Sequence, residues 1–298
     1  MEHYSVLNKE VIKKLNINPA GIYVDATLGL GGHAKQIAKK LTSGTLFAFD
    51  QDNEALTFAK DQLKSYSNII YINDNFKNLK DQLEKHHIKE IDGIIYDLGT
   101  SYFQLTEESR GFTYHGEAKL DMRMDQNQDL SAYEVVNTYP EEKLADIFFR
   151  FGDEKQARKL AKAIVDRRTN QTIVTNVQLN EIIKQVKGWN KKKHPSKNIF
   201  QAIRIEVNKE LEVLETSLVD ALSLLKVGGI CEVISFHSLE DKIVKDIFWK
   251  NKEDIMITPL GNQPRFHTSK AVYPSPKELL ENKSSRSAKL RTIKKIHE

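Results

Sequence analysis

Short apolar runs alternate with amphipathic stretches over residues 22–97. The apolar runs have the length of buried strands, and each is followed by a stretch with apolar residues at helical spacing. Strands that alternate with helices of about ten residues predict right-handed βαβ units on a parallel sheet. The expected strands are Ile22–Asp25, Thr45–Asp50, Asn68–Ile72 and Ile91–Asp97, and the expected helices are Gly32–Leu41, Asn53–Leu63 and Lys77–Lys85.

The pattern changes after Asp97. Residues 98–130 lack a strand pattern, and helical spacing then dominates as far as Leu225. The expected helices are 141–151, 155–168, 175–186 and a long one over Ile199–Leu225, followed by a strand at Ile230–Phe236 and a helix at Leu239–Trp249. The sequence therefore predicts an α/β sheet domain, residues 1–105 and 201–298, interrupted by an all-helical insert at 106–200.

Composition places the chain among globular proteins. Of its 298 residues, 40% are hydrophobic and 29% are charged, which excludes disordered, collagen-like and disulfide-scaffold classes. The single cysteine, Cys231, allows no internal disulfide and favours a reducing compartment. The first residues lack a secretory signal pattern, and no apolar run is long enough to span a membrane. We therefore expect a cytoplasmic protein without a membrane partner.

The net charge of +4 is unevenly distributed. Residues 265–298 contain nine Lys or Arg and three Glu, a net charge of +6, so the remainder carries −2. A second cluster of five lysines without an acidic residue lies at Lys187–Lys197, and Lys283–Lys295 is expected to form a mobile basic tail. Basic clusters on a near-neutral protein favour a polyanion partner, and solvated surface lysines are an equally weighted alternative.

Ligand-type residues follow three of the expected strands. Gly29, Gly31 and Gly32 lie between the first strand and its helix, where glycine lets the backbone approach a ligand and exposes helix N–H groups. Asp50 ends the second strand and Asp97 the fourth, at the edge where open α/β sheets bind ligands. A tight turn alone would also explain the glycines, but with both carboxylates present the pattern predicts a nucleoside-cofactor site.

The identity of the nucleoside stays a preference at this point. The glycines read G-x-G-G and lack the third glycine of the dinucleotide fingerprint, and no phosphate-binding P-loop sequence occurs. S-adenosylmethionine carries a ribose without a phosphate, so a glycine turn and a ribose carboxylate suffice to bind it. NAD is disfavoured without being excluded.

Longer motifs carry a family resemblance that covers about residues 3–291. They are His3–Leu7, Asp97–Leu105, Arg110–Tyr114, Leu120–Asp125, Phe200–Asn208, Ser235–Asp241 and Ser285–Arg291. Together these segments resemble the MraW family of bacterial 16S ribosomal RNA methyltransferases. The resemblance implies a class I, Rossmann-like S-adenosylmethionine-dependent sheet with an inserted helical substrate-recognition domain. It implies N4-methylation of a decoding-centre cytosine, with 16S rRNA or the small ribosomal subunit as partner, and it is compatible with a homodimer.

The resemblance also implies roles for individual residues. Gly31, Gly32 and His33 would cradle the cofactor, Asp50 would hold its ribose, Phe76 would pack on the adenine, and Asp97 and Gln104 would complete the pocket. For the reaction itself, Asp97 and Ser101 are candidates to accept an N–H of the acceptor amine. Thr100 and the pair Tyr102-Phe103 depart from the residues usual in the family, which leaves the shape of the acceptor pocket open.

Other interpretations remain beside this one. A non-catalytic RNA-binding or ribosome-assembly factor on the same fold is the main alternative to an enzyme, and an NAD-dependent oxidoreductase is a third. The histidines lack metal-ligand spacing, so no metal site is expected. Several residues of the motifs are also explained by a purely structural role. Asp121, Arg123 and Asp125 could form an internal salt bridge, and His237, Glu240 and Asp241 could cap a helix. Arg204 and Asn208 could form internal hydrogen bonds, and Phe112 and Tyr114 could belong to the core.

Overall fold

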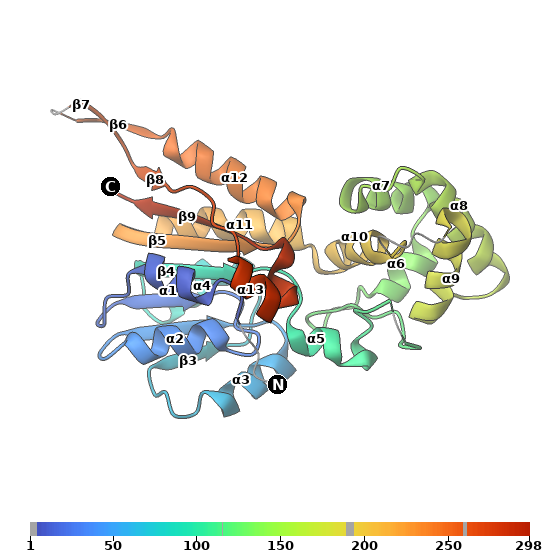
Figure 1. Ribbon diagram of the computed structural model, residues 1–298, viewed down its shortest axis with the longest axis horizontal. Coiled ribbons are helices and arrows are strands. Elements are labelled where there is room, and N and C mark those ends of the chain that lie inside the picture. The colour runs from blue at the N-terminus through green and yellow to red at the C-terminus, as the bar shows by residue number, and fades with distance from the viewer. Residues whose placement is uncertain (1–4, 115, 189–193, 259–260) are drawn as a thin grey trace. The chain divides into compact units, whose positions relative to one another are not determined.

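The structure is a computed structural model that describes residues 5–114, 116–188, 194–258 and 261–298. The chain divides into two compact units, Met1–Ser101 with Leu211–Glu298, and Tyr102–Glu210 (Figure 1). His3 and Tyr4 of the opening motif lie outside the described residues, as do Trp189 and Lys191–Lys193 of the lysine cluster. In the described ranges, no helix is long and apolar enough to cross a membrane.

The first unit is built on a seven-stranded sheet with the strand order β3-β2-β1-β4-β5-β9-β8. The first five of these strands are parallel, and β9 and β8 are antiparallel to their neighbours. The strands are β1 (Ile22–Asp25), β2 (Thr45–Phe49), β3 (Ile69–Ile72), β4 (Ile91–Asp97), β5 (Leu225–Ser235), β8 (Phe266–Thr268) and β9 (Lys289–Lys295). The predicted α/β fold is therefore confirmed, with five parallel strands in a mixed sheet.

Helices cover both faces of this sheet because its strands alternate apolar side chains to either side. One face packs against α1 (Asn8–Leu15), α2 (Gly32–Lys40) and α3 (Asn53–Gln62). The other packs against α4 (Leu79–Lys85), α11 (Glu210–Leu224) and α12 (Ser238–Lys252). The remaining elements of this unit are η1 (Phe76–Asn78), the hairpin β6 (Ile255–Thr258) and β7 (Gly261–Pro264), α13 (Pro276–Glu281) and η3 (Lys283–Ser287).

The second unit is helical. It contains α5 (Tyr102–Thr106), η2 (Glu108–Arg110), α6 (Ala132–Thr138), α7 (Glu141–Gly152), α8 (Ala157–Asn170), α9 (Asn176–Lys187) and α10 (Lys197–Asn208). Ser131 and Thr175 start α6 and α9 with capping boxes, which satisfy the first N–H groups of each helix. The longer helices bury their apolar stripes, such as Leu144, Phe148 and Leu160, in one core.

The long helix predicted over Ile199–Leu225 is wrong, because the structure breaks it in two. Lys209 has a φ of 50° and separates α10 from α11. Asn208 fixes the end of α10, since its side chain accepts from Met124 N at 2.8 Å and donates to Met122 O at 2.8 Å. The second unit therefore extends to Glu210 and starts at Tyr102, beyond both ends of the predicted 106–200.

The basic C-terminal segment is a strand within the sheet, so the prediction of a mobile tail is wrong. Strand β9 pairs with β5 on one side and β8 on the other, and Leu290 and Ile293 are fully buried. Two of its cations hold Asp241: Lys289 Nζ lies 2.7 Å from Oδ2, and Arg291 Nε lies 2.7 Å from Oδ1. Although partial burial opposes them, these cations lower the pKa of Asp241. The segment is therefore part of the fold.

Shortening Ile293 to alanine is expected to cost about 2–5 kcal/mol of unfolding free energy, because its side chain is fully buried in the sheet core. Urea unfolding followed by circular dichroism measures this loss. Lys294→Ala, on the adjacent exposed residue of β9, is the control and should stay within about 0.5 kcal/mol of the wild type. Equal stability of the two variants would mean that β9 is not integral to the sheet.

Candidate functional site

Three carboxylates gather at the carboxyl ends of β1, β2 and β4. Asp25 ends β1, Asp97 ends β4, and Asp50 directly follows β2. The strand order reverses between β1 and β4, and ligands of open α/β sheets bind outside the strand ends at such a switch point. The site predicted from the sequence therefore lies where the topology favours a ligand.

The glycine turn after β1 adopts backbone angles that are unfavourable for residues with a side chain. Gly29 and Gly31 have φ values of 50° and 80°. A Cβ at Gly31 would lie 2.7 Å from Leu63 Cδ1, so a larger residue would have to displace the Leu63 side chain as well as adopt a strained φ. Gly31 is the N-cap of α2, and Gly32 and His33 form its first turn, where the N–H groups have no partner within the helix. These N–H groups and the helix dipole suit a carboxylate or another anionic group.

Asp50 links the glycine turn to the start of α3. Its Oδ2 accepts from Gly29 N at 2.8 Å, and its Oδ1 accepts from Asp52 N at 2.9 Å. Each carboxylate oxygen can accept a second hydrogen bond, so both can still receive a hydroxyl group. Burial raises the pKa of Asp50 to about 7, although the two N–H groups oppose the shift.

His33 lies between two carboxylates on the same edge. Its Nε2 is 3.5 Å from Asp97 Oδ2, and its side chain is buried. Burial favours the neutral ring, but Asp97 and then Asp25 outweigh it and raise the pKa of His33 above its usual value. Burial raises the pKa of Asp25 to about 6, and the nearby His33 opposes that rise. The charge of Asp25 and that of His33 therefore depend on one another.

Two buried polar atoms on this edge have no hydrogen-bond partner in the described part of the chain. They are His33 Nδ1 and Asp97 Oδ1, whereas His33 Nε2 faces Asp97 Oδ2 at 3.5 Å. Buried polar groups without partners are uncommon and ask for an explanation such as a ligand. A ligand at the strand ends would supply partners for these atoms.

Phe76 stands at the start of η1, after β3. Its ring meets Tyr96 edge-on, with centroids 5.5 Å apart, and it is half-buried. Neighbouring asparagines tie this segment to the segment that follows β2: Asn75 Nδ2 donates to Gln51 Oε1 at 2.5 Å, and Asn73 Nδ2 donates to Asp50 O at 2.9 Å. The structure therefore connects the Phe76 segment to Asp50.

Ser101 and Gln104 follow β4. A Cβ built on Gly29 would lie 3.7 Å from Ser101 Cβ, so Ser101 is close to the glycine turn. Gln104 is buried in α5, which belongs to the second unit. The structure thus brings Gly31, His33, Asp50, Asp97 and Ser101 to one edge of the first unit, and it places Gln104 a few residues further along the chain.

Sequence reasoning missed two residues of this edge. Asp25 is buried, and its Oδ1 accepts from Thr27 N at 3.1 Å. Thr27 Oγ1 in turn accepts from Asp97 N at 2.6 Å, which joins the ends of β1 and β4. Asp25 ends its strand as Asp97 does, and that shared position was the signal that could have identified it.

The structure confirms a structural role for most of the motif residues outside the strand-end edge. Arg123 forms a double hydrogen bond with Asp121, at 3.0 and 2.8 Å, and Asp125 accepts from Asn127 N at 2.9 Å. Arg204 Nε lies 2.8 Å from Glu210 Oε1. Phe112 is buried in the helical core, and Tyr114 packs against that core. These side chains therefore form contacts within the second unit.

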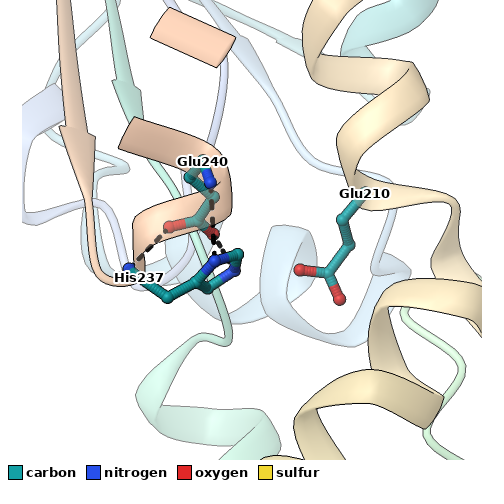
Figure 2. A group of neighbouring side chains, drawn as sticks. All are labelled: Glu210, His237 and Glu240. Atoms are coloured by element: carbon teal, nitrogen blue, oxygen red, sulfur yellow. Dashed lines mark hydrogen bonds and ion pairs between the residues drawn. The ribbon is translucent and has the colours of Figure 1, made fainter. Parts of the chain in front are cut away.

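His237 and Glu240 form the cap of α12. His237 is the N-cap residue, and Glu240 accepts from its backbone N–H at 3.2 Å, completing a capping box (Figure 2). Glu240 also accepts from Phe236 N at 2.8 Å and is buried. The close-up also labels Glu210, the first residue of α11. His237 and Glu240 therefore have a structural role at the start of α12.

Comparison with known proteins assigns the family. The model of the MraW methylase family matches residues 1–296. The chain belongs to this family. Ribosomal RNA small subunit methyltransferase H of Oceanobacillus iheyensis is 49% identical over 100% of the chain and 95% of the relative. Ribosomal RNA small subunit methyltransferase H 1 of Acholeplasma laidlawii is 49% identical over 99% of both chains. Ribosomal RNA small subunit methyltransferase H of Clostridium botulinum is 46% identical, also over 99% of both chains.

A member of the MraW methylase family is a methyltransferase, and S-adenosylmethionine is its cofactor. The strand-end residues fit this molecule. Asp25 and Asp97 would provide negative charge for its sulfonium and ammonium groups, and the first turn of α2 would suit its carboxylate.

Affinity for S-adenosylmethionine is expected to rise with pH through about 7. Only the ionised form of Asp50 accepts from both hydroxyls of a ribose, and its pKa of about 7 leaves it mostly protonated at pH 6. The expected gain between pH 6 and pH 8 is about fivefold to tenfold, from one group titrating near 7. Calorimetry measures it, and the difference from Asp50→Asn isolates this group from the titration of the ligand. If the affinity of the wild type for S-adenosylmethionine changes with pH in the same way as that of Asp50→Asn, the proposed contact of Asp50 with the ribose is contradicted.

Proposed function

We propose that this chain transfers a methyl group from S-adenosylmethionine to N4 of a cytosine in the decoding centre of 16S ribosomal RNA. The observation that carries the proposal is the Asp97 carboxylate at the switch point, 3.5 Å from His33, in a chain of the MraW methylase family. The names of the relatives support rRNA of the small subunit as the substrate.

The cofactor-holding roles are part of the proposal. Gly31, Gly32 and His33 bind the methionine end through backbone N–H groups, and Asp50 accepts from the ribose hydroxyls. Phe76 packs against the adenine, and Gln104 and Asp97 complete the pocket. When bound, S-adenosylmethionine supplies an electrophilic methyl group on a sulfonium.

Asp97 and Ser101 are proposed to orient the acceptor amine. The lone pair of a cytosine N4 is delocalised into the ring, so an acceptor for one of its N–H groups localises it for attack. The buried Asp97 Oδ1, which has no hydrogen-bond partner among the described residues, is suited to that role. Holding the amine in line with the methyl group supplies most of the rate gain, because positioning alone removes a large part of such barriers.

His33 acts as a positioning residue for Asp97. Its Nε2 faces Asp97 Oδ2, which leaves Oδ1 for the acceptor. The amine must lose a proton after it gains a methyl group, and Asp97 is the proposed first acceptor of that proton. Asp97 in turn raises the pKa of His33, which favours the charged ring beside the carboxylate although burial opposes it.

The partner and compartment follow from the substrate. We assign RNA recognition to the helical unit, Tyr102–Glu210, and expect 16S rRNA, free or within the small subunit, in the cytoplasm. An RNA base must leave its stack to enter such a site, at a cost of about a few kcal/mol. A homodimer stays a prediction, which analytical ultracentrifugation checks.

Transfer of a labelled methyl group from S-adenosylmethionine to unmethylated small subunits tests the proposal. The enzyme hypothesis predicts label in 16S rRNA in repeated turnovers. A non-catalytic assembly factor would bind the subunits and leave them unlabelled. Binding without label, with the wild-type protein and intact cofactor, would favour that alternative.

A further inference from the structure

A hollow of about 310 Å³ lies on the first unit, away from the strand-end site. Its lining residues come from α12, from residues 268–271 at the end of β8 and after it, and from β9. Four of its lining residues are cations, Lys245, Lys252, Lys270 and Arg291, and none of its lining residues in the described part of the chain is acidic. An aromatic residue, Trp249, lines it as well. A concave basic surface of this kind suits an anionic partner.

Trp249 is unusually exposed for so large a side chain. It lies on the face of α12 that also carries Lys245 and Lys252, at helical spacings of four and three residues, while Phe248 is buried in the core. The Trp249 side chain is 55% exposed, and Lys252 Nζ lies 5.1 Å from the centroid of its ring. Packing does not explain this exposure, and an open indole beside cations is a surface on which a nucleobase can stack.

The lysines of the hollow are available for a ligand. Within the described part of the chain, Lys245, Lys252 and Lys270 form no ion pair, whereas Arg291 is already paired with Asp241. Two acidic residues near the hollow in sequence are paired elsewhere, Asp246 with Lys242 and Asp254 with Arg265. A third, the exposed Glu253, directly follows Lys252 and leaves the hollow with an excess of cations. Lys14 adds a cation at the rim, since its Nζ donates to Ser269 Oγ at 3.0 Å.

We propose that this hollow binds a single-stranded stretch of the RNA substrate, with a base stacked on Trp249 and phosphates held by Lys245, Lys252 and Lys270. The inference rests on the proposed function and adds to it a second RNA contact outside the methyl-transfer site. A stacking ring flanked by lysines is the usual combination for unpaired RNA. A lipid surface fits less well, because the neighbours of Trp249 on this face are charged rather than apolar.

The test measures binding of the full-length protein to a 16S rRNA fragment over a range of salt concentrations. The triple variant with Lys245, Lys252 and Lys270 changed to alanine should lower the slope of log affinity against log salt by about 2, since each phosphate contact on single strands contributes about 0.7. Trp249→Ala should weaken binding about tenfold, and Trp249→Phe should restore most of the loss.

Matched controls separate this surface from general effects. Lys39→Ala on α2 and Phe58→Ala on α3 remove an exposed cation and an exposed aromatic residue on the opposite face of the sheet, and should leave RNA binding unchanged. All variants should keep the wild-type affinity for S-adenosylmethionine. The proposal is overturned if the Trp249 and lysine variants bind RNA with the wild-type affinity and salt slope, or if they lose only binding to phosphatidylserine vesicles.

Failure of the RNA-binding surface can be distinguished from failure of the proposed methyl transfer. If the wild-type chain binds the RNA through this hollow yet transfers no methyl group, the methyl-transfer proposal fails and the surface stands. If it methylates the RNA equally well with and without Trp249 and the lysines, the surface fails and the methyl-transfer proposal stands.

Discussion

Asp97→Asn is expected to lower the single-turnover rate of methyl transfer by about 10²–10⁴-fold, the usual range for a lost acid–base group. The amide keeps the size of the side chain but cannot take a proton from the acceptor amine. It also removes the charge that His33 faces across 3.5 Å. Rapid-quench measurement with saturating S-adenosylmethionine and RNA reports the chemical step directly.

Asp92→Asn is the matched control for Asp97→Asn. Asp92 lies on the same strand near the opposite end, where it accepts from Ile22 N at 2.8 Å and pairs with Lys226 at 2.8 Å. Its change should reduce stability while the rate stays near that of the wild type. The proposed role of Asp97 fails if both variants lose rate equally, or if Asp97→Asn transfers at the wild-type rate.

Asp50→Ala is expected to weaken binding of S-adenosylmethionine by about 10²-fold, since hydrogen bonds to a charged group contribute about 1.5–3 kcal/mol. Affinity for RNA should change little, because the carboxylate faces the turn at Gly29 and the start of α3. Calorimetry with each ligand separates the two effects.

The alanine variant also removes two hydrogen bonds from the turn, so Asp50→Asn serves as its companion. The amide oxygen can still accept from Gly29 N, which keeps part of the local structure while the charge is lost. Both variants should lose cofactor affinity, and Asp50→Asn should unfold closer to the wild-type temperature. Equal losses of cofactor and RNA affinity would contradict a ribose-binding role.

The sheet and its strand ends were predictable because their residues obey local rules. Apolar runs of strand length that alternate with helical spacing placed β1 to β4 close to their observed bounds. The carboxyl ends of parallel strands meet at one edge, so Asp50 and Asp97 were predictable as neighbours of the glycine turn.

The features that escaped prediction depend on contacts distant in sequence. The break at Lys209 accompanies the hydrogen bonds of Asn208 to the backbone of Met122 and Met124, which no local pattern reveals. Strand β9 is rich in lysine, a composition that predicts a solvated tail, yet its Leu290 and Ile293 are buried, and the strand pairs with a neighbour on each side.

The most direct test of the central claim is mass spectrometry of nucleosides from 16S rRNA. Small subunits that lack the modification are incubated with S-adenosylmethionine and either the wild-type chain or Asp97→Asn. N4-methylcytidine is expected at a decoding-centre cytosine with the wild-type chain, and it should be lost with Asp97→Asn. Methylation of a different atom or nucleoside, or none by the wild-type chain, would contradict the central claim.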